Sequence, residues 1–201
     1  MLFRSVITVA DSRYPAALRR TGSPPPVLCV EGSLDVLQRP AVAIVGTRDC
    51  TGYGRRVARR LAEQLAQGGR VVVSGLARGI DEEAHLGACD AGATVAVLGH
   101  GLGHTAPASH RGLRRRIVAQ GGAMVSAWPD DVAPRPFTFP QRNAWISGLS
   151  DAVVVVEAGE RSGALITARW ASQDGREVFA VPGPVGAPAS AGCLRDRKSV
   201  M

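Results

Sequence analysis

The sequence has almost no lysine, few aromatic side chains and no paired cysteines. Lys198 is the only lysine among 24 basic residues, and Phe, Trp and Tyr make up 4% of the 201 residues. The four cysteines, Cys29, Cys50, Cys89 and Cys193, form no C-x-x-C pair. The sequence therefore predicts neither a zinc site nor a disulfide framework.

Long hydrophobic runs are also missing. No apolar stretch reaches the length that a membrane-crossing helix requires. The start, Met1–Ser5, lacks the basic segment and the sustained apolar stretch of a secretory signal. We therefore expect a cytoplasmic protein that makes no membrane contact.

Positive charge exceeds negative charge. The formal net charge is +7, and nearly all of the basic residues are arginine. An excess of positive charge favours polyanionic partners such as nucleic acids, nucleotides or anionic membranes. Arginine also forms planar, bidentate contacts with phosphate. A genome rich in G and C raises arginine content in any protein, so the arginine excess alone does not identify the partner.

Apolar runs of strand length alternate with segments of helical periodicity. Residues 41–45 are continuously apolar, which is typical of a strand buried on both faces. We expect strands at residues 41–45, 70–73, 93–98, 123–125, 152–156 and 177–181, and helices at 52–67, 80–91, 113–119, 143–149 and 164–173. This alternation predicts a Rossmann-like α/β fold, doubly wound, with a mostly parallel sheet and helices on both faces.

Prolines and composition divide the chain into three parts. Tyr14-Pro15 and the run Pro24–Pro26 favour extended or turn conformations. We expect an N-terminal arm at residues 1–40, with one short strand at 27–30. A Rossmann-like domain follows at 41–183, and a C-terminal tail at 184–201.

Small polar residues and arginines follow several of the expected strands. Gly46, Thr47 and Arg48 follow the first strand of the domain, and Ser74 begins a loop that contains Arg78. In a parallel sheet, ligands bind beyond the carboxyl ends of the strands. Helix starts and arginines in such loops attract phosphate groups. Several loops of this kind at one edge suit a phosphate backbone better than a single nucleotide.

A dinucleotide cofactor is disfavoured. The first loop lacks the G-x-G-x-x-G spacing, and the second strand runs into Ser74-Gly75 where a ribose-binding acid would stand. We expect no cofactor. We interpret Asp81 as a helix N-cap, and Ser162 as either an N-cap or part of a phosphate site.

Two other groups of residues carry alternative interpretations. Phe137 and Phe139 stand near Arg142 in a long proline-rich loop, where they could stack on bases or fill the core. Four histidines cluster around the second helix and the loop after the third strand, namely His85, His100, His104 and His110. We expect these histidines to pack or to lie at the surface, because His100 and His104 have no carboxylates nearby that would complete a metal site.

Several motifs occur in order along the chain. They are Ile44–Arg48 with Thr51–Gly54, Ser74–Asp81 with Ala84-His85, Phe139–Asn143, Ile146–Ser150, Ser162–Ala168 and Arg176–Gly183. With these motifs the chain resembles the DNA-processing protein A (DprA/Smf) family of bacteria, from about Tyr14 to Gly183. Many motifs in one order make the resemblance specific.

The resemblance implies a DNA-binding domain at residues 41–183 that performs no catalysis. It further implies cooperative binding of single-stranded DNA, protection of incoming DNA, a homodimer, loading of the RecA recombinase and a role in natural transformation. Carried over by position, the DNA-binding residues are Gly46, Thr47, Arg48, Ser74, Arg78, Phe139, Arg142, Asn143, Ser162 and Gly163. From the loops after the expected strands and the helices that they enter, we expect further DNA-binding residues at Thr51, Tyr53, Gly54, Gly75, Gly79 and Thr167.

The chain departs from the family pattern at a few positions. Gly101–Gly103 replaces the usual Gly-Leu-Asp, and Ala106-Pro107 replaces Tyr-Pro. Ala144 follows Arg142-Asn143 where the family has a second arginine, and the tail departs after Cys193. These changes put the rim of the pocket, dimerisation and recombinase loading in question.

Two other functions are compatible with the sequence. Nucleoside-monophosphate phosphoribohydrolases have related folds, and Glu157 and Glu160 lie near the position of their carboxylate. Residues 158–163 lack the Pro-Gly-Gly-x-Gly-Thr pattern of those enzymes, however, and Arg161 stands beside Glu160. The other alternative is a nucleotide-sensing domain, which would prefer mononucleotides to oligonucleotides.

Overall fold

The computed structural model describes residues 4–184 and 186–196. Its strands are β1 (Arg4–Thr8), β2 (Val27–Gly32), β3 (Ala41–Val45), β4 (Val71–Ser74), β5 (Thr94–Val97), β6 (Ala123–Ser126), β7 (Ala152–Val155) and β8 (Glu177–Ala180). Its α-helices are α1 (Ala16–Arg19), α2 (Gly52–Gln67), α3 (Ile80–Ala91), α4 (Arg111–Ala119), α5 (Thr138–Gly148), α6 (Ala164–Gln173) and α7 (Ala191–Asp196). Short 3₁₀ helices lie at Asp35–Gln38, Ala108–His110 and Pro188–Ser190.

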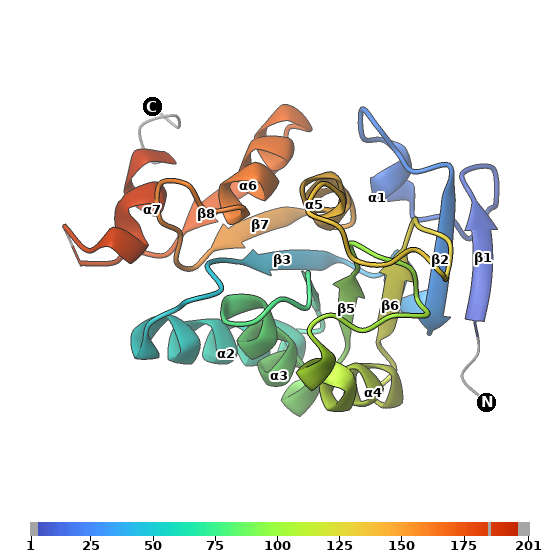
Figure 1. Cartoon of the computed structure of the whole chain (residues 1–201), viewed down its shortest axis with the longest axis horizontal. Coiled ribbons are helices and arrows are strands. Elements are labelled where there is room, and N and C mark those ends of the chain that lie inside the picture. Colours follow the sequence, from blue (N-terminus) through green and yellow to red (C-terminus); the bar gives the residue numbers. More distant parts are fainter. Residues whose placement is uncertain (1–3, 185, 197–201) are drawn as a thin grey trace.

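The described strands form one sheet with the order β1-β2-β6-β5-β4-β3-β7-β8. The strands from β3 to β8 run parallel to one another, whereas β2 pairs antiparallel with both β1 and β6. Helices α2, α3 and α4 cover one face, and α1, α5 and α6 cover the other (Figure 1). This arrangement confirms the predicted Rossmann-like, doubly wound α/β fold.

Alternate residues of the central strands pack on opposite faces of the sheet. Ala43 and Val45 join a core that includes Ile146 of α5 and Ala168 of α6. Ile44, between them, packs against alanines of α2 and α3 on the other face. Because both faces are covered, the central strands need apolar residues at every position, which explains their continuous apolar runs.

The strand order reverses between β3 and β7. From β3 the chain builds β4, β5 and β6 on one side, and then returns to place β7 and β8 on the other side. Open α/β sheets bind ligands beyond the carboxyl ends of their strands at such a switch point. The loops after β3 and β7 are therefore where a binding site is expected.

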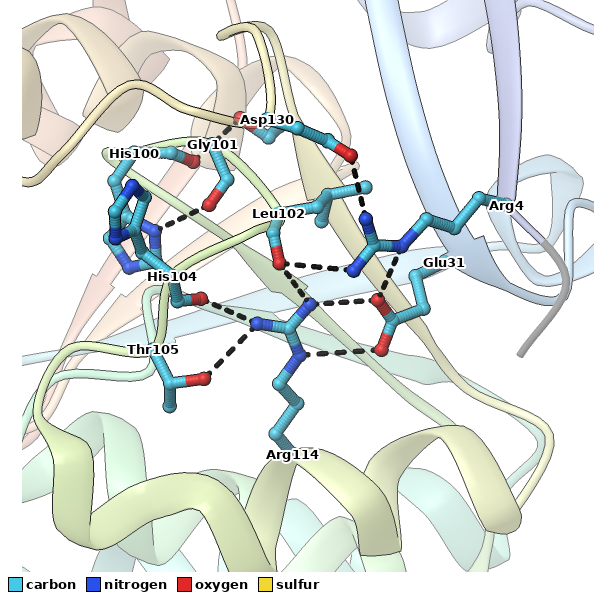
Figure 2. Close-up of polar contacts among 10 residues, drawn as sticks. Arg4, Glu31, His100, Gly101, Leu102, His104, Thr105, Arg114 and Asp130 are labelled. Atoms are coloured by element: carbon cyan, nitrogen blue, oxygen red, sulfur yellow. Dashed lines mark hydrogen bonds and ion pairs between the residues drawn. The ribbon is translucent and has the colours of Figure 1, made fainter. Parts of the chain in front are cut away.

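The first forty residues, predicted as an arm, supply two strands to the same sheet. Arg114 of α4 donates from Nε and Nη2 to the two carboxylate oxygens of Glu31 on β2, at 3.3 and 2.7 Å, and both side chains are buried. Arg4 of β1 also contacts Glu31, at 3.2 Å, and reaches Asp130 after β6, at 2.6 Å (Figure 2). These contacts connect the arm to the rest of the sheet. The division of the chain at residues 40 and 183 stays a prediction.

Several elements differ from the expectation, among them the short helices α1 and α7, which the sequence does not predict. Helix α5 begins at Thr138 rather than at residue 143, because Pro140 lies in its first turn, where a backbone N–H has no intrahelical partner to lose. No strand is expected from the sequence at β1. Only Ile7 of that strand is buried, so β1 shows no apolar alternation.

Candidate nucleic-acid interface

A cavity of about 770 Å³ lies at the switch point between β3 and β7. Its walls come from the loop after β3, the first half of α5, the loop after β7 and the start of α6. Arg48, Arg135, Arg142 and Arg161 line the cavity, against one acidic side chain, Asp81. The lining is therefore cationic, which suits an anionic ligand.

The structure brings more than half of the sequence-predicted residues to this cavity. Those that line it are Gly46, Thr47, Arg48, Phe139, Arg142, Asn143, Ser162, Gly163 and Thr167. The others, which lie outside its lining, are Thr51, Tyr53, Gly54, Ser74, Gly75, Arg78 and Gly79. Contact of any of these residues with DNA stays a prediction.

Arg142 fixes a positive charge at the cavity. Its side chain is buried, with Nη1 donating to the carbonyl oxygens of Gly75 at 2.6 Å and Val97 at 2.5 Å. Gly75 has no room for a Cβ, which would clash with this guanidinium. Burial lowers the pKa of Arg142 to about 10, against the opposing effect of Asp81. The group is therefore still charged at pH 7, and its Nε has no hydrogen-bond partner among the described residues.

Asp81 binds the loop after β4 instead of capping α3. Gly79 is the N-cap of α3 and makes no side-chain capping bond, so the predicted N-cap role of Asp81 is wrong. The loop folds back over the helix start, and Asp81 Oδ2 accepts from the N–H groups of Gly75 at 3.2 Å and Ala77 at 3.4 Å. Burial raises the pKa of Asp81, opposed by the charge of Arg142 and by these hydrogen bonds.

Two arginines lie close to the aromatic ring of Phe139. The guanidinium carbons of Arg48 and Arg142 lie 5.5 and 5.9 Å from its ring centroid, within the range of cation–π attraction. Phe139 is partly buried and lines the cavity. Phe137 is 55% exposed and lies outside the lining, so the interpretation that it fills the core is wrong. The cavity thus contains the elements of a base-stacking site at Phe139.

The start of α6 forms another wall. Asn143 Nδ2 donates to the carbonyl oxygen of Gly163 at 3.0 Å and so connects α5 to the residue before α6. Ser162 Oγ accepts from the N–H of Ala164 at 3.3 Å. Thr167, one turn further on, is buried. A helix N-terminus at a cationic cavity favours the binding of an anion.

An internal carboxylate occupies the start of α2, where the sequence predicts an anion site. Glu157 is buried and accepts from the backbone N–H of Thr51 at 2.9 Å and from its hydroxyl at 2.5 Å. Thr51 Oγ1 also accepts from the N–H of Gly54 at 3.1 Å, which caps the helix. The hydroxyl of Tyr53 donates to the carbonyl oxygen of Pro182 at 3.1 Å. Part of this helix start is therefore satisfied inside the protein.

The loop after β4 is packed, apart from one exposed arginine. Ser74 is buried and its hydroxyl donates to the carbonyl oxygen of Ile44 at 2.6 Å. Gly79 has φ 82°, and a Cβ there would lie 2.5 Å from the carbonyl oxygen of Arg48. Only glycine fits such a position without strain. Arg78 is exposed beside this contact, so it can reach an extended ligand without lining the cavity.

Two lining arginines, Arg135 and Arg161, are absent from the sequence-predicted set. Arg135 precedes α5 in the long loop, and Arg161 follows β7. Both are exposed. Their proximity to Phe139 and Ser162 in the sequence is a usable signal, because arginines beside predicted phosphate loops often face the same ligand.

Residues 4–184 and 186–196 contain no helix with the length and apolarity that crossing a bilayer requires. In the same ranges no three His, Cys, Asp or Glu side chains are grouped so that they could hold a metal ion. His100 and His104 contact each other edge to face, with ring centroids 6.4 Å apart. His85, His100 and His110 are buried.

The family model of DNA recombination-mediator protein A matches residues 5–199. The chain is 50% identical to Protein Smf of Escherichia coli K12 over 185 residues, which cover 91% of this chain and 50% of that protein. The chain thus spans about half the length of this curated relative.

Two solved structures are also similar. That of DNA processing protein A from Streptococcus pneumoniae has a TM-score of 0.91 and 37% identity, over 97% of this chain and 69% of that one. That of DNA processing protein A from Helicobacter pylori has a TM-score of 0.88 and 28% identity, over 99% and 89%. The Helicobacter structure is described as giving insight into a single-stranded DNA binding mode.

Proposed function

Because the chain belongs to the family of DNA recombination-mediator protein A, we propose that it binds single-stranded DNA in the arginine-lined cavity between β3 and β7. The observation that carries this proposal is the composition of the lining. It contains four arginines, one partly buried phenylalanine and a single carboxylate. Arginine charge attracts the phosphates, and an aromatic face stacks on any base.

A single strand suits this cavity better than a duplex. Base stacking at Phe139 requires an unpaired base that can turn out of its own strand. A duplex keeps its bases inside the helix and offers the cavity only phosphates. The cavity volume of about 770 Å³ also falls within the range of ligand pockets, so it suits one part of a strand whose remainder lies outside.

We propose that the protein does no chemistry on the DNA. Glu157, one of the two carboxylates that suggested a phosphoribohydrolase, caps α2 through Thr51 and does not line the cavity. The other, Glu160, is likewise outside the lining. Asp81 is held by backbone N–H groups and lies among arginines. Release of free base from a nucleoside monophosphate would contradict this part of the proposal.

The family and the resemblance support a wider role for the protein. We propose that it acts in the cytoplasm as a homodimer, protects incoming DNA and loads a RecA-type recombinase during natural transformation. Analytical ultracentrifugation tests the dimer, and a strand-exchange assay in the presence of single-strand-binding protein tests the loading. Residues 41–183 form the DNA-binding part in this proposal.

The binding proposal is tested by titrating a fluorescent oligothymidine and its duplex with oligoadenosine at two salt concentrations. We expect the single strand to bind more tightly, with affinity falling steeply as salt rises, since bound arginines release counterions. Equal affinity for the single strand and the duplex would show that Phe139 does not stack on an unpaired base. An affinity that does not change with salt would show that the arginines do not bind the phosphates.

A further inference from the structure

Helix α2 carries four arginines, and one pair of them is used in packing. Arg55 lies 3.5 Å and Arg59 3.8 Å from the carboxylate of Glu83 on α3. Arg59 also lies 3.0 Å from Asp90 at the far end of α3. Arg55 and Arg59 therefore connect α2 to α3.

The second pair has no such partner. Arg56 and Arg60 are one turn apart on α2 and both are exposed. Among the side chains that the structure describes, no carboxylate lies within ion-pair distance of either. Like charges at this spacing destabilise a helix. No ion pair among the described residues involves these two arginines.

The unpaired arginines lie on the helix that follows a loop of the cavity. Arg48 lines the cavity, and the same segment enters α2 a few residues later (Figure 1). The Arg56 side chain folds back toward this entry, with Nη1 3.5 Å from the position that a Cβ would take on Gly52. Arg60 lies about 6 Å further along the axis, at 1.5 Å per residue. Arg56 and Arg60 therefore lie on the helix that directly follows the loop of Arg48, with Arg56 close to the helix entry.

The chemistry of this face fits a nucleic acid. Tyr53 stands three residues before Arg56, on the same side of the helix, and is 42% exposed. Among the large apolar side chains that the structure describes as exposed, Tyr53 alone lies on α2. A protein partner would require a larger apolar centre. Arginines with an isolated aromatic ring are typical of a surface that follows a single strand.

We propose that Arg56 and Arg60 bind the phosphate backbone of the DNA strand after it leaves the cavity, an inference that rests on the proposed function. The cavity and the α2 face then form one continuous site, and the length of DNA decides how much of it is used. A short strand occupies the cavity alone. A longer strand also reaches α2.

The test compares oligothymidines of about 6 and about 20 nucleotides, which lie near the lower end of the range of single-strand site sizes and above that range. Fluorescence anisotropy measures the affinity of wild-type protein and of the double variant Arg56→Gln/Arg60→Gln. We expect the variant to bind the short oligonucleotide as wild type does. It should bind the long one at least about threefold more weakly, and the slope of log affinity against log salt should become shallower by about 1.4, the value for two single-strand phosphate contacts.

The matched control is Arg55→Gln/Arg59→Gln, which removes the same charge from the same helix but from the stripe facing α3. Melting temperatures of both variants are measured alongside, since the control breaks ion pairs. We expect the control to change stability more than the affinity for the long oligonucleotide.

The outcomes separate the two proposals. If the wild type binds neither oligonucleotide, the proposed function fails and this inference fails with it. If the wild type binds both and the Arg56→Gln/Arg60→Gln variant matches it on the long one, only the α2 contact is overturned. Equal losses in the two double variants would also overturn it, because they would reflect net charge alone.

Discussion

His85 lies fully buried on α3, and its hydrogen bonds define its protonation. Its Nδ1 is 2.8 Å from Thr94 Oγ1, whose own proton goes to the carbonyl oxygen of Val72 at 2.6 Å. Thr94 must therefore accept, so His85 carries its proton on Nδ1. Its Nε2 has no partner among the described residues. Burial, together with the charges of His110 and Arg142, lowers the pKa of His85 to about 3.

The neutral state of His85 predicts a pH dependence of stability. Because the folded-state pKa lies below the unfolded value of 6.5, this contribution is complete above pH 6.5 and is lost as the pH falls toward 3. We expect the free energy of unfolding to decrease by up to about 1.4 kcal/mol per pH unit in this window. Urea denaturation between pH 7 and pH 5 measures the slope.

His85→Asn is the control for this slope, since its amide can replace the Nδ1 donor and does not titrate. Burial also lowers the pKa of His100, which adds to the slope in both proteins. The difference between the two proteins therefore isolates His85. Identical slopes of the free energy of unfolding against pH in the two proteins would show that protonation of His85 does not destabilise the folded state.

Arg142 provides a second prediction at the level of a single residue. Arg142→Gln removes the positive charge that stabilises the ionised form of Asp81. It also removes the two hydrogen bonds that the guanidinium donates to backbone carbonyls. Removing one partner of a buried charge arrangement costs roughly 3 kcal/mol. We expect chemical denaturation to show a loss of that order, and the double variant with Asp81→Asn to lose less than the sum of the two single variants. Additive losses would mean that the two charges are independent.

At the level of elements, the loop after β4 is held from two sides. Asp81 of α3 binds its N–H groups, and Arg142 of α5 binds the carbonyl oxygen of Gly75. Gly75→Ala would place a Cβ against the guanidinium. We expect a loss of about 1–3 kcal/mol in the free energy of unfolding, typical of overpacking, together with weaker single-strand binding, because the loop carries Arg78.

Gly112→Ala on α4 is the matched control for this substitution. No atom lies within 4 Å of a Cβ at that position, and the helix there should gain about 0.5–1 kcal/mol. Stability and binding are measured by urea denaturation and anisotropy. If Gly75→Ala matched Gly112→Ala in stability and in binding, the loop after β4 would not be held by Arg142 as described.

The order of elements from β3 to β8 follows from the sequence, because buried parallel strands and amphipathic helices have distinct apolar periods. The position of the cavity follows as well, since the strand ends indicate it. The partners of individual polar groups do not follow. Glu157 lies far along the chain from Thr51, and Ile44 far from Ser74, so only the folded chain shows that these hydroxyls are already bound.

At the level of the whole molecule, the N-terminal strands and the central sheet share one buried polar cluster. Arg114 binds Glu31, the carbonyl oxygens of Leu102 and His104, and the hydroxyl of Thr105 (Figure 2). Strand β2 also pairs directly with β6. The segment predicted as an arm is thus integrated into the body of the protein.

This integration predicts that the arm and the sheet unfold together. Glu31→Gln leaves Arg114 buried without its counter-charge and should cost roughly 3 kcal/mol. We expect the transitions seen by tryptophan fluorescence and by circular dichroism to coincide in both wild type and variant. Separate transitions, with the arm lost first, would show that the arm is an independent unit.

Substitution of Arg48 shows whether the cavity between β3 and β7 holds single-stranded DNA. Arg48 lines the cavity and lies over Phe139, whereas Arg39 stands at the opposite end of β3, before its first residue. Arg48→Ala and Arg39→Ala remove the same charge. In an anisotropy titration with oligothymidine, we expect Arg48→Ala to weaken binding by roughly 1–3 kcal/mol and Arg39→Ala to leave it near wild type. Equal affinities for Arg48→Ala and wild type would contradict the account.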